Sequence, residues 1–209
     1  MKRKTFETKL PPFYQEVAHI RSDEMKTGLW YDLKAMLPGL VLTAIGWITV
    51  RPTVAQTLVS LAVFVAAICP YFTLHEIVHG MVVKSMTRQR VEIGFHRYGM
   101  YCGMPDLYLY QSVAVNCTAA PLAVFSILFG VGAIFLIAFG RWTFLPLGLL
   151  MSLHLFGCRA DVHLLEALRK YESASLLVKD TGSEQWLYDR KQKEPCHTVL
   201  QNCYDDRSG

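Results

Sequence analysis

Charged side chains are scarce in this 209-residue sequence, where Asp, Glu, Lys and Arg together make up 18% of the residues. A soluble domain usually carries about 25% charged residues. Hydrophobic residues reach 52%, and they are gathered into long blocks rather than spread evenly. This distribution argues against an ordinary soluble domain and predicts an integral membrane protein with one compact domain.

The sequence also shows no disulfide framework and no nucleic-acid-binding charge pattern, and we expect no signal peptide. Its six cysteines show no framework spacing. The basic N-terminus is followed by polar residues where a signal peptide would have an apolar core. The net charge of +4 comes from basic residues beside apolar blocks, which favours lipid headgroups of a bilayer as partners and predicts no nucleic-acid partner.

Four apolar blocks predict four transmembrane helices. A spanning helix needs about 20 apolar residues, so the two shortest blocks are expected to extend into flanking residues. The blocks cover residues 35–50, 53–83, 113–139 and 143–158. We therefore expect an all-α membrane protein with four transmembrane helices, divided into an N-terminal segment 1–34, a four-span membrane core 35–175 and a tail 176–209.

Lys and Arg residues fall almost entirely on one side of these predicted spans. Residues 1–34 hold seven, the 84–112 loop holds four and the tail from residue 159 holds eight, whereas the two other connections hold one each. Cytoplasmic loops carry the excess of basic residues in membrane proteins. The expected location is thus the cell membrane, with several spans and with both termini and the middle loop in the cytoplasm.

Short segments outside the spans indicate some β-structure and one further helix. Residues 91–95 alternate apolar with small or polar side chains, and 100–102 resume the apolar run, which predicts a small cytoplasmic β-hairpin element. A second hairpin is expected from 176–178 and 186–188, on either side of a turn. Residues 162–171 have the apolar spacing of an amphipathic helix.

The strongest chemical signal is the motif His75-Glu76-Ile77-Val78-His79. On a helix, residues i and i+4 share one face, so His75 and His79 are positioned to bind one Zn²⁺ ion. Glu76 lies one step round the helix and is placed to act as the catalytic general base. The alternative is a pair of ordinary helix-surface histidines, but ionisable residues near a membrane span are rare and usually functional.

A catalytic zinc needs a third protein ligand, for which Asp161 is our candidate. The predicted topology runs both the second and the fourth span toward the cytoplasm, which places Asp161 at the same depth as the two motif histidines. Asp161 could instead pair with Arg159 or be solvated. His163 and His154 are competing ligands, and His154 could also be a hydrogen-bonded interior residue beside the site.

Asn116 is a candidate for substrate or oxyanion binding. It lies at the predicted cytoplasmic start of the third span, and its amide could donate a hydrogen bond to a substrate carbonyl. Polar contact between helices explains an asparagine at this position equally well.

At these residues the chain resembles a zincin peptidase family of small bacterial membrane proteins and, more distantly, the site-2 proteases. The matching pieces are Leu74 to Gly80, Ala119 to Leu122 and Gly157 to Val162. Site-2 proteases bind zinc with the two motif histidines and a later aspartate, so the resemblance implies His75, His79 and Asp161 as ligands. Ala120 and Val162 stand where site-2 proteases usually have glycine.

These observations together predict a membrane-embedded zinc metallopeptidase, a hydrolase that cleaves a peptide bond of a protein or peptide substrate near the cytoplasmic face. Two alternatives remain open at this point. One is a non-catalytic zinc-binding scaffold or regulator, for which Glu76 would not be needed. The other is a metal or proton transporter, for which polar residues should also line the outer halves of the spans.

Overall fold

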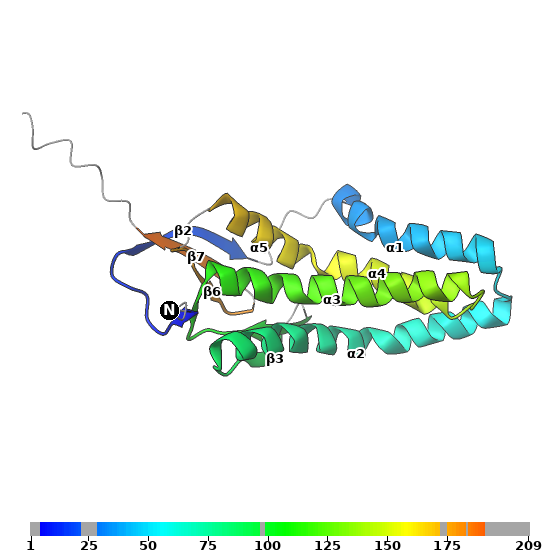
Figure 1. Ribbon diagram of the computed structural model, residues 1–209, viewed down its shortest axis with the longest axis horizontal. Coiled ribbons are helices and arrows are strands. Elements are labelled where there is room, and N and C mark those ends of the chain that lie inside the picture. Colours follow the sequence, from blue (N-terminus) through cyan, green and yellow to red (C-terminus); the bar gives the residue numbers. More distant parts are fainter. Residues whose placement is uncertain (1–4, 22–28, 97–98, 172–174, 183, 191–209) are drawn as a thin grey trace, which may run out of the picture.

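The computed structural model describes residues 5–21, 29–96, 99–171, 175–182 and 184–190 of the chain, and five helices dominate it (Figure 1). Each predicted helical block is confirmed as a helix. The first block extends into flanking residues, as expected of a short block, whereas the fourth, which was also expected to extend, ends within its own bounds. The amphipathic segment after the fourth block is also helical. The helices are α1 (Leu29–Val50), α2 (Val54–Thr87), α3 (Gln111–Ala138), α4 (Phe144–Gly157) and α5 (Arg159–Lys170).

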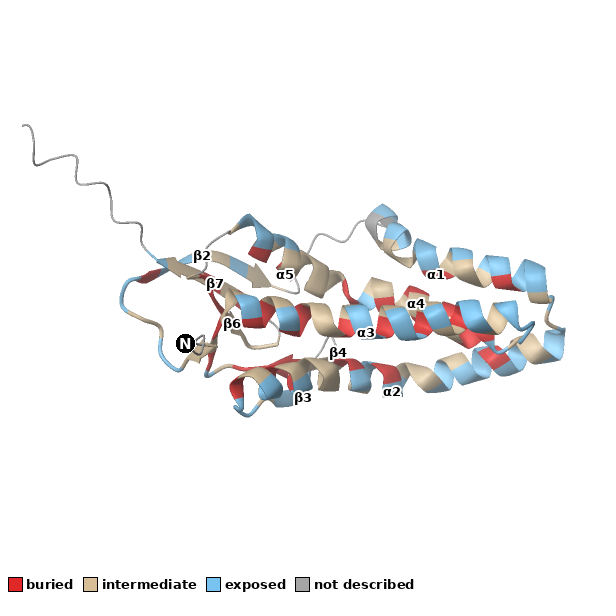
Figure 2. Ribbon diagram, viewed as in Figure 1, coloured by how far each residue is buried: buried red, intermediate tan, exposed pale blue. Residues whose placement is uncertain are grey.

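The helices α1, α2 and α3 are each long and apolar enough to cross a membrane. The helices α4 and α5 meet that condition only as a pair, and the pair is bent by 46° at the break between them. The number of candidate spans is therefore three, or four if the bent pair is one span. Large apolar side chains are exposed along these helices, including Val65, Ile127 and Val131. Figure 2 shows exposed residues in pale blue along the ribbons of α1, α2 and α3. Exposed apolar faces of this length indicate a membrane protein.

Local sequence features set the ends of α2 and the close packing of α1 on α4. Thr53 and Gln56 form a capping box at the start of α2, and Arg88 ends that helix in the left-handed conformation. A Cβ atom at Gly39 of α1 would overlap the backbone of Ser152 on α4. Glycine there lets the two helix backbones approach closely, as small residues commonly do between membrane helices.

The β-structure is larger than the hairpin element that the sequence predicts. Both predicted hairpins are confirmed, but one belongs to a five-stranded antiparallel sheet with the order β1-β5-β6-β7-β2. The N-terminal segment supplies two of these strands. Its alternation is interrupted by a register shift between Glu16 and Ala18, which hides the strand pattern in the sequence. The strands of the sheet are β1 (Phe6–Glu7), β2 (Tyr14–Arg21), β5 (Tyr108–Tyr110), β6 (Leu177–Asp180) and β7 (Glu184–Arg190).

The sheet gathers three segments that are far apart in the sequence at one end of the helix bundle (Figure 1). The N-terminal segment, the connection between α2 and α3, and the chain after α5 each contribute strands to it. A separate two-stranded hairpin, β3 (Glu92–His96) and β4 (Gly99–Gly103), lies against α2. Because hydrogen-bonded strands must be neighbours, these three segments lie at the same end of the bundle.

Candidate functional site

The two motif histidines face a carboxylate from another helix. His75 and His79 are one turn apart on α2, and Asp161 is in the first turn of α5, immediately after the bend. The Nε2 atom of His75 lies 3.4 Å from Oδ2 of Asp161, and Nε2 of His79 lies 3.5 Å from Oδ1. The structure therefore brings together all three residues that the sequence suggests as metal ligands, and this group can hold a metal ion.

The other ring nitrogen of each histidine contacts a group outside this triad. The Nδ1 atom of His79 lies 2.9 Å from the carbonyl oxygen of Cys117 on α3. The Nδ1 atom of His75 lies 3.4 Å from the hydroxyl of Tyr71, one turn earlier on α2. Metal-binding histidines usually have such a partner, because it fixes the orientation of the ring and leaves the other nitrogen for the metal.

Arg159 does not compete with the histidines for Asp161. Its guanidinium forms an ion pair with Asp32 on α1, and its Nε donates to the carbonyl oxygen of Phe156 at 3.0 Å. The guanidinium also stacks over the Phe156 ring at 4.1 Å from the ring centroid. The alternative in which Asp161 pairs with Arg159 therefore does not occur in the structure.

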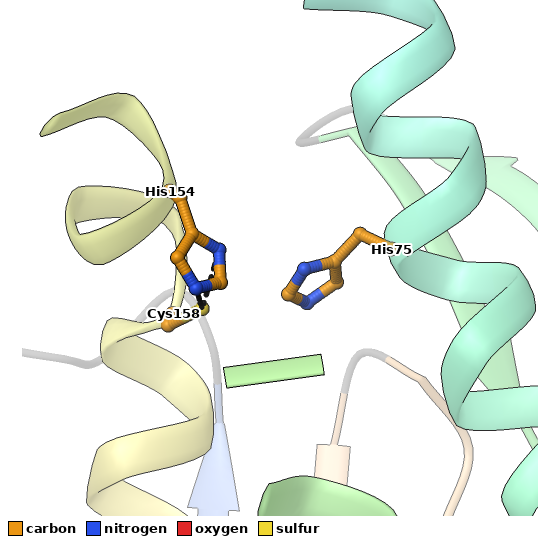
Figure 3. A group of neighbouring side chains, drawn as sticks. All are labelled: His75, His154 and Cys158. Carbon is orange, nitrogen blue, oxygen red and sulfur yellow. Dashed lines mark hydrogen bonds between the residues drawn. The ribbon is translucent and has the colours of Figure 1, made fainter. Parts of the chain in front are cut away.

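A second group that can hold a metal ion shares His75 with the first (Figure 3). It consists of His75, His154 on α4 and Cys158 at the break between α4 and α5, and all three side chains are buried. His154 is fully buried, and Figure 3 shows its ring and that of His75 approaching each other from facing helices. Its Nδ1 atom lies 2.9 Å from the Tyr71 hydroxyl and 3.4 Å from the Cys158 sulfur.

Glu76, His75 and His79 of α2 line a cavity of about 610 Å³. Residues of α3, α4, α5, the β3–β4 hairpin and the β6–β7 turn form the rest of its wall. The backbone N–H of Cys102 on β4 donates to the Glu76 carboxylate. Gly80 allows the hairpin to come this close, because a Cβ atom there would lie 3.1 Å from a methyl group of Val91. The hairpin that the sequence predicts as a cytoplasmic element thus forms one wall of the cavity.

The structure places two other candidate residues, Asn116 and His163, outside the site. Asn116 is exposed on α3 and does not line the cavity, whereas the next two residues, Cys117 and Thr118, do. One residue on a helix corresponds to a rotation of about 100°, which is enough to turn the amide away. His163 faces Glu166 on its own helix at 3.7 Å and does not line the cavity either.

Tyr71 is one residue of the site that the sequence does not single out. It is 4% exposed, and its hydroxyl contacts both His75 and His154. The signal that could have found it is its position four residues before His75, which places both side chains on one face of α2. An aromatic residue in an apolar block is more readily taken for core packing, and the Tyr71 ring does pack against Phe125 and Phe129.

The β6–β7 turn adds a carboxyl group to the cavity wall. Asp180 accepts a hydrogen bond from the backbone N–H of Gly182 at 2.7 Å. Burial raises the pKa of Asp180 to about 6, and the negative charge of Asp161 acts in the same direction, while the hydrogen bond from Gly182 opposes it. Burial also raises the pKa of the Cys102 thiol, to about 12, so this thiol is protonated at neutral pH.

The chain matches no protein-family model, and no curated protein or solved structure is significantly similar to it. The resemblance to zincin peptidases therefore rests on the motif residues alone, and the chemistry of the site follows from its own geometry.

Proposed function

We propose that this protein is a membrane-embedded zinc metallopeptidase that hydrolyses a peptide bond near the cytoplasmic face of the cell membrane. The single observation that carries the proposal is the meeting of His75 and His79 of α2 with Asp161 of α5, beside Glu76 in the same cavity. Sequence position alone gives the histidine pair. The fold supplies a carboxylate within 3.5 Å of both imidazoles.

The donor set fits zinc. Two imidazole nitrogens and one carboxylate are a common set of protein ligands in catalytic zinc sites, which leave a further position for water or substrate. Zinc held there would act as a Lewis acid and lower the pKa of a coordinated water. The surrounding apolar side chains of α2 and α4 keep the local dielectric constant low, which strengthens the interaction of the ligands with a cation.

The first group is a better zinc site than the group containing His154 and Cys158. His154 already uses both ring nitrogens: Nε2 lies 3.2 Å from the Leu122 carbonyl oxygen, and Nδ1 lies 2.9 Å from the Tyr71 hydroxyl. A metal ion at His154 would have to displace the Tyr71 hydrogen bond. His75 and His79 both have a nitrogen that faces only Asp161 and the cavity.

Glu76 is the proposed general base. Its carboxylate lines the cavity next to the histidines, where it can accept the proton of the attacking water and pass it to the leaving amine. The Cys102 N–H group holds the carboxylate from the hairpin side. A scaffold that only bound a metal ion would not need a carboxylate in this position.

The sheet supports a common location for both termini and the middle loop. All three segments contribute strands to it, so they lie on one side of any membrane that the bundle crosses. The same segments hold 19 of the 21 Lys and Arg residues. By the positive-inside rule that side is the cytoplasm, and the cavity, which the β6–β7 turn helps to line, is at the cytoplasmic end.

The position of β4 supports an extended peptide as substrate. This strand pairs with β3 on one side, and on its other side the N–H group of Cys102 points to Glu76. Met100, Tyr101 and Cys102 of β4 line the cavity. A peptide laid along this edge could form backbone hydrogen bonds with β4 while its scissile bond faces Glu76.

The test is a comparison of protein N-termini in membranes that contain either the wild type or the Glu76→Gln variant, together with the zinc content of both purified proteins. We expect equal zinc and new N-termini only with the wild type. Glu166→Gln, on the exposed side of α5, is the matched control and should cleave as the wild type does.

The other outcomes lead to the two alternatives. Equal zinc in both proteins with the same N-termini in both membranes would support a non-catalytic zinc-binding scaffold. Zinc uptake into vesicles that contain the purified protein, with no cleavage, would support a transporter.

A further inference from the structure

We propose that Tyr71 and Pro121 are positioning residues that hold both metal-facing histidines as the Nδ1–H tautomer. This inference rests on the proposed function, because it concerns the same metal site. It assigns a role to two residues that are not metal ligands and that take no part in proton transfer to the substrate.

The His79 side of the argument begins with a proline inside α3. In a regular helix the N–H group of residue 121 would donate to the carbonyl of residue 117, but proline has no N–H group. Pro121 therefore leaves the Cys117 carbonyl without its helical donor. That carbonyl oxygen lies 2.9 Å from Nδ1 of His79. A carbonyl oxygen only accepts, so Nδ1 of His79 carries the proton and Nε2 keeps its lone pair.

The His75 side follows from a chain of hydrogen bonds. The Nε2 atom of His154 lies 3.2 Å from the carbonyl oxygen of Leu122 and 3.3 Å from the hydroxyl oxygen of Ser126. The carbonyl only accepts and the hydroxyl can also accept, so both contacts are satisfied when Nε2 of His154 carries the proton. In the neutral ring Nδ1 is then an acceptor, and the Tyr71 hydroxyl donates to it at 2.9 Å. The Tyr71 oxygen is left to accept from Nδ1 of His75 at 3.4 Å. His75 is therefore also the Nδ1–H tautomer.

The two arrangements have the same consequence at the site. Each histidine presents an unprotonated Nε2 to the point that Asp161 also faces. A neutral imidazole binds a metal only through its unprotonated nitrogen, so the tautomer decides whether the donor set is complete. If His75 or His79 carried the proton on Nε2 instead, its metal-facing lone pair would be lost. The outer contacts thus favour the tautomer that can bind the ion.

The experiment measures zinc affinity of the purified full-length protein by competition with a chelator, for Tyr71→Phe and Pro121→Ala. Loss of a partner behind a metal ligand typically weakens metal binding about 10- to 100-fold, and we expect a loss in this range for each variant. Tyr71→Phe keeps the ring that packs on Phe125 and removes only the hydroxyl. The matched controls are Tyr108→Phe in the sheet and Pro38→Ala inside α1, which should bind zinc as the wild type does.

Two further readouts separate positioning from a structural effect. Imidazole ¹⁵N chemical shifts of the zinc-loaded wild type should show a protonated Nδ1 and a metal-bound Nε2 at both histidines. The shifts also test the proposal if Pro121→Ala does not fold. The absorption spectrum of the Co²⁺-loaded protein should lack a thiolate charge-transfer band, because Cys158 is not a ligand in this arrangement.

The outcomes distinguish this inference from the proposed function. Wild-type zinc affinity in both variants, coordination through Nδ1, or a thiolate band would each overturn the inference, and the last would move the metal to His154 and Cys158. A wild-type protein that binds no zinc would instead overturn the proposed function.

Discussion

The Nε2 atom of His79 on α2 lies 3.5 Å from the Oδ1 atom of Asp161 on α5, across the interior of the bundle. The bend of 46° between α4 and α5 begins immediately before the turn that carries Asp161. An ion bound between these residues would link the two helices, so metal binding should stabilise the bundle as a whole.

Asp161→Asn should weaken zinc affinity by about 10- to 100-fold or more. Loss of a partner behind a metal ligand has an effect of this size, and loss of the charge of a direct ligand should have a larger one. A metal ion that binds only the folded state stabilises it by about 2.7 kcal/mol when the free metal concentration is 100 times the dissociation constant. Chelation should therefore lower the melting temperature of the wild type and barely change that of the variant. His163→Ala is the control and should behave as the wild type. Normal zinc binding by Asp161→Asn would remove this residue from the ligand set.

Glu76→Gln should retain zinc and lose hydrolysis by about 10²- to 10⁴-fold, the usual contribution of a general base. The amide cannot accept a proton from the attacking water. His79→Ala should lose both zinc and hydrolysis, because it removes a ligand. Zinc content and cleavage rates on one peptide substrate, once found, measure both effects. Retained hydrolysis in Glu76→Gln would exclude this residue as the base.

Membrane orientation can be tested with single cysteines and a thiol reagent that does not cross membranes. Arg141→Cys, in the exposed connection after α3, should react from outside intact cells. Lys170→Cys, exposed at the end of α5, should react only after the cells are opened. The background should carry serine at Cys69, which is exposed, and at Cys196 and Cys203, which lie outside the described residues. The reverse labelling pattern would invert the proposed orientation.

Asp180→Asn should change how stability depends on pH. The pKa of Asp180 is raised to about 6 in the folded protein from an ordinary value of 3.8, so the folded state binds more protons between these values. The stabilisation of the folded state by the protonated Asp180 carboxyl group is therefore present below pH 4 and is lost as the pH rises to 6. Melting curves of the metal-free protein should show the variant gaining a few degrees on the wild type across this range. A constant difference between the two proteins would contradict the raised pKa.

Much of the helical fold could be predicted from the sequence because its signals are local. Long apolar blocks give the helices, and four-residue spacing places His75 and His79 on one face of a helix whatever surrounds it. Even the position of Asp161 near the histidines could be predicted, because the distribution of Lys and Arg predicts which ends of the spans lie on the same side of the membrane. Strand β2 could not be predicted in this way, because its pairing with β7 joins chain segments from opposite ends of the sequence.

Local sequence patterns predict the helices, the histidine pair and the glutamate between them, since each depends on residues within a turn or two of one another. The directions in which side chains face around those helices depend instead on how the helices pack together. Asn116 turns outward and Cys117 inward, and Tyr71 reaches both His75 and His154. Rotation of a helix about its axis is set by packing against its neighbours, which no local pattern in an almost uniformly apolar segment specifies.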